Sequence, residues 1–437
     1  PAVRPVFITE KRPDEVGHSV GTSGMLQGLQ GLPLALPMVL LAVSGAILHL
    51  CQRVTRAQPT DQLMAMATMT GDRLSAAAPA QTTNRVTVTP GDHVLRLAID
   101  PSHFDGFYDS WHASFPEGSS IYNYSALDRE PRATIDAVDS SFIHTMRWLP
   151  PEVMKEVLRM PFDDEGPAAI LISGLPLDLD VPPTPLIDTL HRVGDAWDEK
   201  RVPIAESLLF GISRALGIPY APAQTNPIGR GLIRDMAPVS DVVSSCSSDL
   251  RMHSDYPRLV TTRHSEPEFL VLFAVRGDRT HQARTQIVNS RKLMDAMDPD
   301  DRRLLRSCKI QAALPGQGNL GAAFYPISTD GATGQPHLTM INKTDETRFT
   351  SPDGGAAAVA AYDRLNQLAY ALADPVDLQP GQCLIMNNTR LIHARSAFAP
   401  IGDGEDRWII KTFVSSDVWR RPGTGKPGET WYPRLLV

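Results

Sequence analysis

The sequence has few cysteines and no excess of basic charge. Its four cysteines, Cys51, Cys246, Cys308 and Cys383, lie far apart with no CxxC pair, which argues against a structural zinc site and predicts free thiols in a reducing compartment, the cytoplasm. Charged residues make up 21% of the 437 residues and the formal net charge is −7, so the composition offers no basic surface for nucleic acid. Hydrophobic residues, at 42%, are ample for a large core.

Residues 16–52 contain no Asp, Glu, Lys or Arg. Residues 32–50 are apolar and just long enough to span a bilayer, but Pro33 and Pro37 shorten the clean helix to about residues 37–51. We expect a buried helix or one that docks onto a partner, such as a second copy of the chain; membrane contact and a targeting segment stay open. A linker at residues 75–84 then divides the chain into an N-terminal extension, 1–84, and a main domain, 85–437.

The main domain alternates short apolar runs with a smaller number of helical patterns. Strands are predicted at residues 85–90, 168–176, 231–236, 269–275, 285–289 and 336–341, and helices at residues 142–159, 206–216, 291–307 and 356–373. Short strands interrupted by helices favour a mainly β fold with flanking helices. The specific architecture we expect is a double-stranded β-helix, the jelly-roll or cupin-like core.

Residues 250–255 carry a histidine and a carboxylate, His253 and Asp255, two positions apart. Side chains alternate faces along a strand, so the two point the same way. With one distant histidine they would make the two-histidine, one-carboxylate set that holds non-haem Fe(II) and leaves other positions open. His264 and Glu266 form a rival pair that runs directly into Pro267, and we favour the first pair.

Residues 381–414 supply the distant histidine. They read as a Gly turn, an apolar strand ending in His393, a Gly/Asp loop, and a second apolar strand opened by Arg407. A buried arginine there needs an anion, and its planar fork matches a carboxylate bidentately. A dicarboxylate cosubstrate is one candidate; an internal salt bridge with Asp403, Glu405 or Asp406 is the other.

The stretch from Asn388 through His393 and Phe398 to Asp406-Arg407-Trp408 resembles the C-terminal signature of the clavaminate-synthase-like Fe(II)/2-oxoglutarate oxygenases, relatives of taurine dioxygenase. Residues 174–185 and 253–285 are also similar to this family, and the resemblance covers about residues 142–419. Ala394 departs from the usual glycine.

The resemblance implies Fe(II), 2-oxoglutarate and O2 as cofactors, with His253, Asp255 and His393 as iron ligands. Arg407 would bind the distal carboxylate of 2-oxoglutarate and Thr285 would hydrogen-bond the same molecule. Lys411, four residues beyond Arg407 and so on the same strand face, would help to neutralise a carboxylate.

The activity implied is hydroxylation of an unactivated C–H bond of a free amino acid or small amino-acid-derived metabolite, often in natural-product biosynthesis, with release of succinate and CO2. Arg234, Arg395 and Asn342 are candidate substrate contacts. Desaturation or ring closure by the same iron chemistry, a different metalloenzyme on the same ligands, and a non-catalytic cupin-like binding protein remain as alternatives.

Overall fold

The computed structural model describes residues 86–122, 131–184, 203–220, 232–238, 249–260, 267–313, 322–329, 334–342 and 347–416. The predicted apolar helix, the linker and the domain boundary near residue 84 lie outside these residues, as do Cys51 and Cys246. The assembly or membrane role suggested for residues 1–84 therefore stays a prediction. Cys308 and Cys383 are buried free thiols. Within the described ranges, no helix has the length and apolar character needed to cross a membrane.

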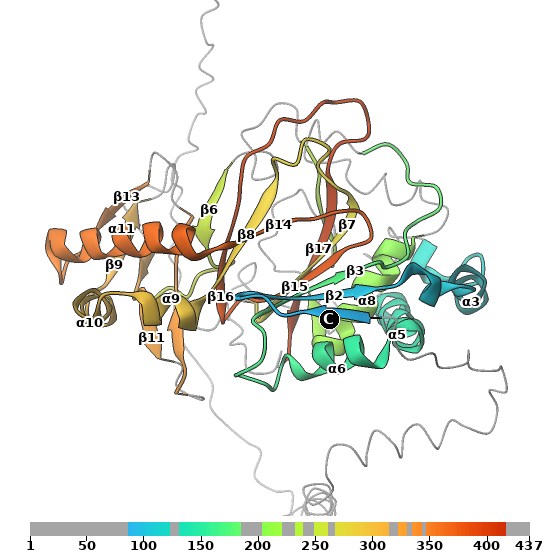
Figure 1. The fold of residues 1–437 in the computed structure, drawn as a ribbon, viewed down its shortest axis with the longest axis horizontal. Coiled ribbons are helices and arrows are strands. Elements are labelled where there is room, and N and C mark those ends of the chain that lie inside the picture. Colours follow the sequence, from blue (N-terminus) through green and yellow to red (C-terminus); the bar gives the residue numbers. More distant parts are fainter. Residues whose placement is uncertain are drawn as a thin grey trace, which may run out of the picture. The chain divides into compact units, whose positions relative to one another are not determined.

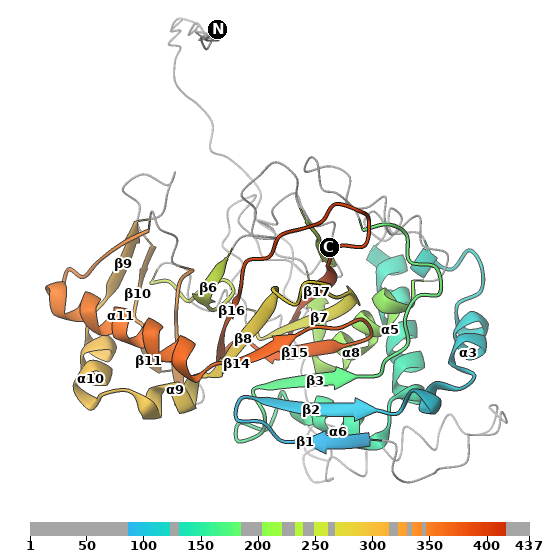
Figure 2. The same ribbon diagram turned by 45° about the horizontal axis from the view of Figure 1, so that its top comes forward.

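Two β-sheets lie at the centre of the described structure (Figure 1). The larger has eight strands, which are, in spatial order, β1 (Val86–Thr89), β2 (Val94–Ile99), β3 (Ala169–Ser173), β15 (Cys383–Asn387), β7 (Phe269–Arg276), β17 (Trp408–Ser415) and β4 (Ile218–Tyr220), with β5 (Arg234–Met236) also paired to β17. The smaller has four, which are β14 (Asp374–Asp377), β8 (Arg284–Asn289), β16 (Leu391–Arg395) and β6 (Leu250–His253). Figure 2 shows β1, β2 and β3 side by side at one edge of the larger sheet.

The inner faces of the two sheets share one apolar core. Leu270 and Leu272 of β7 and Ile409 of β17 meet Ile287 of β8 and Leu391 of β16 there, and all five are buried. Each contributes from alternate positions of its strand because successive side chains point to opposite faces.

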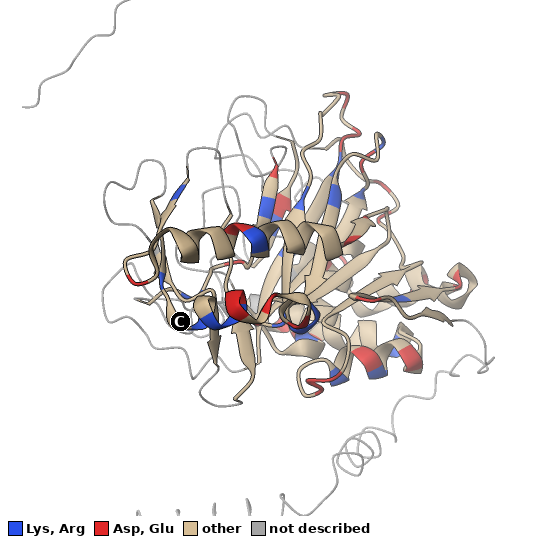
Figure 3. Ribbon diagram, turned by 60° about the vertical axis from the view of Figure 1, so that its left-hand side comes forward, with Lys and Arg blue, Asp and Glu red and all other residues tan. Residues whose placement is uncertain are grey.

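Helices cover the outer faces of both sheets (Figures 1 and 2). On the larger sheet these are α3 (Phe107–Ser114), α5 (Pro131–Trp148), α6 (Pro151–Arg159) and α8 (Ile204–Leu216), and on the smaller α9 (Ser290–Ala296), α10 (Pro299–Ser307) and α11 (Gly355–Leu372). Short strands pack beside the second group, namely β9 (Ile310–Ala313), β10 (Ala322–Phe324), β11 (Ile327–Thr329), β12 (Pro336–Leu338) and β13 (Arg348–Thr350). Charged residues lie on helices and loops and also on several strands (Figure 3).

The mainly β fold with flanking helices is confirmed, with three local corrections. The helix predicted over residues 291–307 is two helices, because the Asp298 side chain caps the second and Pro299 opens it. The helical pattern at 142–159 likewise spans the end of α5 and all of α6, with Pro150 between them. The apolar run that ends in His393 is two strands, β15 and β16, which belong to different sheets.

Candidate metal centre

His253 and His393 face each other across neighbouring strands. Their Cα atoms are register partners in the antiparallel pair β6–β16, and their ring centroids are 4.4 Å apart. His253 ends β6, as predicted. His393 lies in the middle of β16 rather than at a strand end before a turn, because the turn at residues 388–390 comes before it. The pairing nevertheless brings together the two histidines that the sequence singled out.

Asp255 completes a compact donor set with these histidines. Its Oδ1 lies 3.3 Å from Nε2 of His253 and 3.9 Å from Nε2 of His393. Two ligand atoms at right angles around one metal, each about 2.1 Å from it, are ~3 Å apart. The three side chains would therefore move slightly closer together to bind a divalent ion. In the part of the chain that the structure describes, no other group of His, Cys, Asp and Glu has this proximity. The rival pair, His264 and Glu266, lies outside that part.

Both histidines turn Nε2 toward Asp255. Nδ1 of His253 is 2.6 Å from the main-chain carbonyl of Arg251, which only accepts, so the proton is on Nδ1 and Nε2 is free to ligate. Burial and the neighbouring His253 lower the pKa of His393 to about 3, which keeps its ring neutral near pH 7. Metal ligation needs a neutral imidazole, and His393 meets this condition.

The second oxygen of Asp255 is held by a lysine. Nζ of Lys411, from β17, donates to Oδ2 of Asp255 while Oδ1 faces the histidines. Burial alone would raise the pKa of Asp255, but the positive charge of Lys411 is the largest opposing effect, and the pKa of Asp255 is held well below its usual value. The carboxylate is therefore ionised and offers one oxygen to a metal.

Asn388 fixes the main chain of Asp255. Its Oδ1 accepts the N–H of Asp255 at 2.9 Å, and its Nδ2 donates to the carbonyls of Asp255 and Pro267 at 2.9 and 3.0 Å. The side chain is fully buried. The sequence motif contains Asn388, but motif reading assigned it no role; only the fold shows that it clamps the carboxylate ligand from the turn between β15 and β16.

Arg407 lies just before β17 in a second polar group. It is 2% exposed, and its guanidinium carbon is 5.8 Å from the ring centroid of Phe398, whose ring also has the guanidinium of Arg395 at 5.3 Å. Arg395 follows His393 by two positions on β16, so both share a face, and its Cα partner on β8 is Thr285, which is also buried. The fold thus gathers the predicted cosubstrate residue Thr285 and two buried arginines on one side of the metal ligands.

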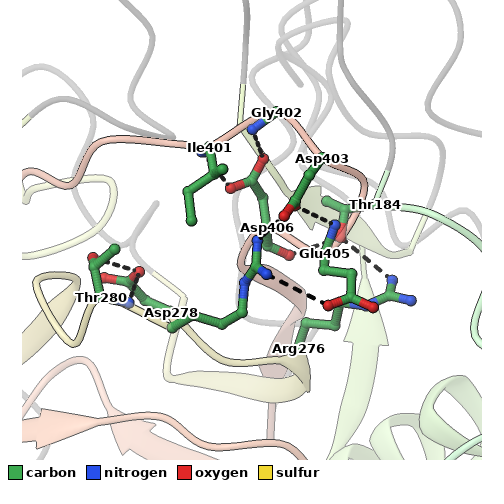
Figure 4. Close-up of polar contacts among 10 residues, drawn as sticks. Thr184, Arg276, Asp278, Thr280, Ile401, Gly402, Asp403, Glu405 and Asp406 are labelled. Atoms are coloured by element: carbon green, nitrogen blue, oxygen red, sulfur yellow. Dashed lines mark hydrogen bonds and ion pairs between the residues drawn. The ribbon is translucent and has the colours of Figure 1, made fainter.

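The three acids considered as internal partners of Arg407 are engaged with other groups (Figure 4). Asp403 binds Arg279 at 2.5 Å, and Glu405 lies 3.5 Å from the same guanidinium. The Asp406 carboxylate accepts two main-chain N–H groups of its own loop, each at 2.7 Å.

The remaining predicted substrate residues divide into two locations. Arg234 on β5 is the Cα partner of Lys411, so the two side chains share a face next to Asp255, and Arg234 is near enough to act on the pKa of Tyr256. Tyr256 directly follows Asp255 with a left-handed φ of 49°. Asn342 instead supports β6, because its Oδ1 accepts the N–H of Arg251 at 2.9 Å.

A two-histidine, one-carboxylate cluster in a fold of two packed sheets is the donor set typical of non-haem Fe(II) oxygenases. Comparison with known families agrees: residues 207–413 match the taurine catabolism dioxygenase TauD, TfdA family. The predicted family and the prediction that the protein is an enzyme, a dioxygenase, are thereby confirmed.

Individual relatives fall in the same group. The chain is 27% identical to L-asparagine oxygenase of Streptomyces coelicolor over 60% of its own length and 77% of that protein. It is 25% identical to clavaminate synthase 2 of Streptomyces clavuligerus over 57% of its length and 74% of that protein. A solved structure of asparagine oxygenase with Fe(II), 2S,3S-3-hydroxyasparagine and succinate has a similar fold, with a TM-score of 0.58 at 21% identity over 77% of this chain and 98% of that one.

Proposed function

We propose that the protein is an Fe(II)- and 2-oxoglutarate-dependent oxygenase that hydroxylates an unactivated C–H bond of a free amino acid or small amino-acid-derived metabolite, releasing succinate and CO2. The observation that carries this proposal is the cluster of His253, Asp255 and His393 inside a dioxygenase-family domain. The relative named L-asparagine oxygenase, and the asparagine oxygenase structure with iron and succinate, support the cofactors and the substrate class. The fold that goes with it is the double-stranded β-helix, or jelly roll.

Each predicted residue has a part in this proposal. His253, Asp255 and His393 would hold the iron, which supplies the oxidant for C–H cleavage when 2-oxoglutarate and O2 are present. Arg407 would bind the distal carboxylate of 2-oxoglutarate through its fork, and the buried Thr285 would donate its hydroxyl to the same molecule. Lys411 balances carboxylate charge at the centre, and the carboxylate that it contacts is Asp255.

The proposed substrate contacts are mainly positively charged side chains. Arg234, beside Lys411 and close to Tyr256, would bind the carboxylate of an amino acid. Arg395 shares the ring of Phe398 with Arg407, so it would orient either carboxylate. Asn342 would act through β6, which it holds in place. A free amino acid fits a site that already contains several fixed positive groups.

An anaerobic titration tests the proposal most directly. Metal-free protein receives Fe(II) and then 2-oxoglutarate while the visible spectrum is recorded. We expect a weak charge-transfer band that needs both additions and that weakens at equal 2-oxoglutarate in an Arg407→Met variant. Bound iron without the band would overturn the oxygenase proposal and leave a cupin-like binding protein.

A panel of amino acids then identifies the substrate and the reaction. Substrate-triggered O2 uptake with one succinate per turnover is expected. Mass spectrometry separates the outcomes, because hydroxylation adds one oxygen atom whereas desaturation or ring closure removes two hydrogens. The second result would keep the iron chemistry and replace hydroxylase with desaturase or cyclase.

A further inference from the structure

The segment that ends at Thr184, which is distant in the sequence, is hydrogen-bonded to the loop that carries Arg407. The main-chain N–H of Thr184 donates to the carbonyl of Gly404 at 2.7 Å. The Thr184 hydroxyl donates to the carbonyl of Asp406, also at 2.7 Å (Figure 4). Thr184 is 4% exposed. The second of these bonds ends on the peptide group that links Asp406 to Arg407, so Thr184 acts directly on the main chain of the arginine.

The loop is also closed on itself at the same residue. The Asp406 carboxylate accepts the N–H groups of Ile401 and Gly402. Gly404 has a left-handed φ of +84°, and a Cβ added there would lie 3.1 Å from Cβ of Pro183. The loop and the residue before Thr184 thus approach more closely than a side chain at position 404 would comfortably permit.

Arg276 anchors the other side of Thr184 to the sheet. Its Nη1 donates to the carbonyl of Pro182 at 2.7 Å and to the Thr184 hydroxyl at 3.3 Å, and its Nη2 donates to Val181 at 3.0 Å. Arg276 is the Cα partner of Trp408, the residue after Arg407, where the register of β17 shifts. The Thr184 hydroxyl therefore links a rigid strand to the peptide next to Arg407.

We propose that Thr184 is a positioning residue for the cosubstrate: it fixes the Asp406–Arg407 peptide so that the Arg407 guanidinium is aimed at the distal carboxylate of 2-oxoglutarate. The inference rests on the proposed role of Arg407. A bidentate arginine–carboxylate contact depends on orientation, so a small rotation of the peptide weakens both of its hydrogen bonds. The position of Thr184 is set by Arg276 on one side and by its two bonds to the loop on the other.

Thr184→Val tests this because valine keeps the shape and removes the hydroxyl. One net hydrogen bond is worth about tenfold in affinity, so we expect a KM for 2-oxoglutarate raised about tenfold. The kcat at saturating 2-oxoglutarate and the KM for the amino-acid substrate should stay within about twofold. Thr184→Ser, which keeps the hydroxyl, should restore the KM. Thr280→Val is the matched control, because the Thr280 hydroxyl binds Asp278 nearby instead of the Arg407 loop (Figure 4).

Two further measurements separate positioning from a general structural role. First, 2-oxopentanoate lacks the distal carboxylate, so its affinity for the Fe(II) protein, followed by the charge-transfer band, should be the same in wild type and Thr184→Val. Second, Thr184→Val should add no loss of 2-oxoglutarate affinity in an Arg407→Met background. A Thr184→Val variant that lowers kcat, weakens 2-oxopentanoate equally or adds its loss to that of Arg407→Met would overturn the inference.

A different result would contradict the proposed function. Unchanged 2-oxoglutarate affinity in Arg407→Met would overturn the assignment of Arg407 itself, whatever Thr184→Val does. If Thr184→Val does not fold, Arg276→Gln removes the same link from its sheet side and should reproduce the selective rise in KM for 2-oxoglutarate. Equal effects of Arg276→Gln on both 2-oxo acids would count against the inference.

Discussion

Lys411 and Asp255 form an ion pair in which Oδ2 of the carboxylate accepts from the ammonium while Oδ1 points at the two histidines. The side chains are 11% and 17% exposed, so both charges are largely removed from water. One carboxylate oxygen thus binds the lysine, and the other is available to a metal. This arrangement ties the metal ligand to β17, the strand that follows Arg407.

Replacing Lys411 with methionine should destabilise the metal-free protein and make it depend more on metal. Removal of one partner leaves the Asp255 charge buried and uncompensated, a loss of about 3 kcal/mol in the free energy of unfolding. A bound divalent ion restores the missing positive charge. The melting temperature should therefore rise more on addition of Mn(II) in Lys411→Met than in wild type, with Lys411→Arg close to wild type. Equal increments in wild type and Lys411→Met would show that the lysine and the metal do not share Asp255.

Asn388→Ala should weaken both the fold and the metal site. Three hydrogen bonds to buried main-chain groups are lost, which costs about 2–3 kcal/mol, and the carboxylate ligand loses its clamp, which costs about 10–100-fold in metal affinity. Calorimetric titration with Co(II) and urea denaturation measure the two effects. Asn387→Ala is the matched control, since the Asn387 side chain binds Thr389 instead and its loss should leave metal affinity unchanged.

The choice between the two His-x-acid pairs is tested by single substitutions. His253→Ala and His393→Ala should each lower the affinity for Fe(II) or Mn(II) by more than about a hundredfold, because loss of a ligand exceeds the usual effect of a supporting residue. His264→Ala should bind metal normally. Metal binding that survives in His253→Ala and fails in His264→Ala would contradict the ligand set.

His144 should make the stability of the protein depend on pH. It lies in the core beside Phe107 and Phe115, and no described residue hydrogen-bonds either ring nitrogen. Burial, with Arg147 adding to it, lowers the pKa of His144 to about 4. In the unfolded chain the pKa is about 6.5, so between these values the unfolded state binds more protons and folding weakens as pH falls.

His144→Leu should remove that dependence. The slope of unfolding free energy against pH between about pH 6.5 and 4 should fall by up to ~1.4 kcal/mol per pH unit, the contribution of one proton. Urea denaturation of both proteins at several pH values in this window measures it. Parallel curves for wild type and variant would show that His144 is protonated in the folded core.

Local patterns in the sequence identified the metal ligands, but they did not give the correct bounds of the strands that carry them. His253 and Asp255 were identified from their two-residue spacing on an expected strand. The strand β6 in fact ends at His253, and Asp255 lies in the bend that follows. His393 was found but misplaced, because the apolar runs at residues 383–386 and 391–392 show no alternation, and the polar residues 387–390 between them were included in one strand. Only the turn at Asn388–Arg390 divides them.

Contacts between distant segments were beyond the reach of the sequence. Lys411 was expected near a carboxylate, but the identity of that carboxylate depends on how β17 lies against β6. Asn388 was visible only as part of a motif, and its three acceptors and donors come from two other segments. Pro299 was a readable helix boundary within residues 291–307 that the apolar periodicity concealed.

Because β6 lies at the edge of its sheet, a bound metal would also stabilise the fold there. In the order β14-β8-β16-β6, β6 is the last described strand of its sheet, whereas its neighbour β16 is paired on both sides. One histidine thus comes from the rim and the other from the interior, and an ion held by both would act as a cross-link between them. Edge strands are the first to fray, so the loaded enzyme should protect the amide hydrogens of β6 from exchange far more than those of β16. Metal availability would then set the lifetime of the protein toward proteases as well as its activity.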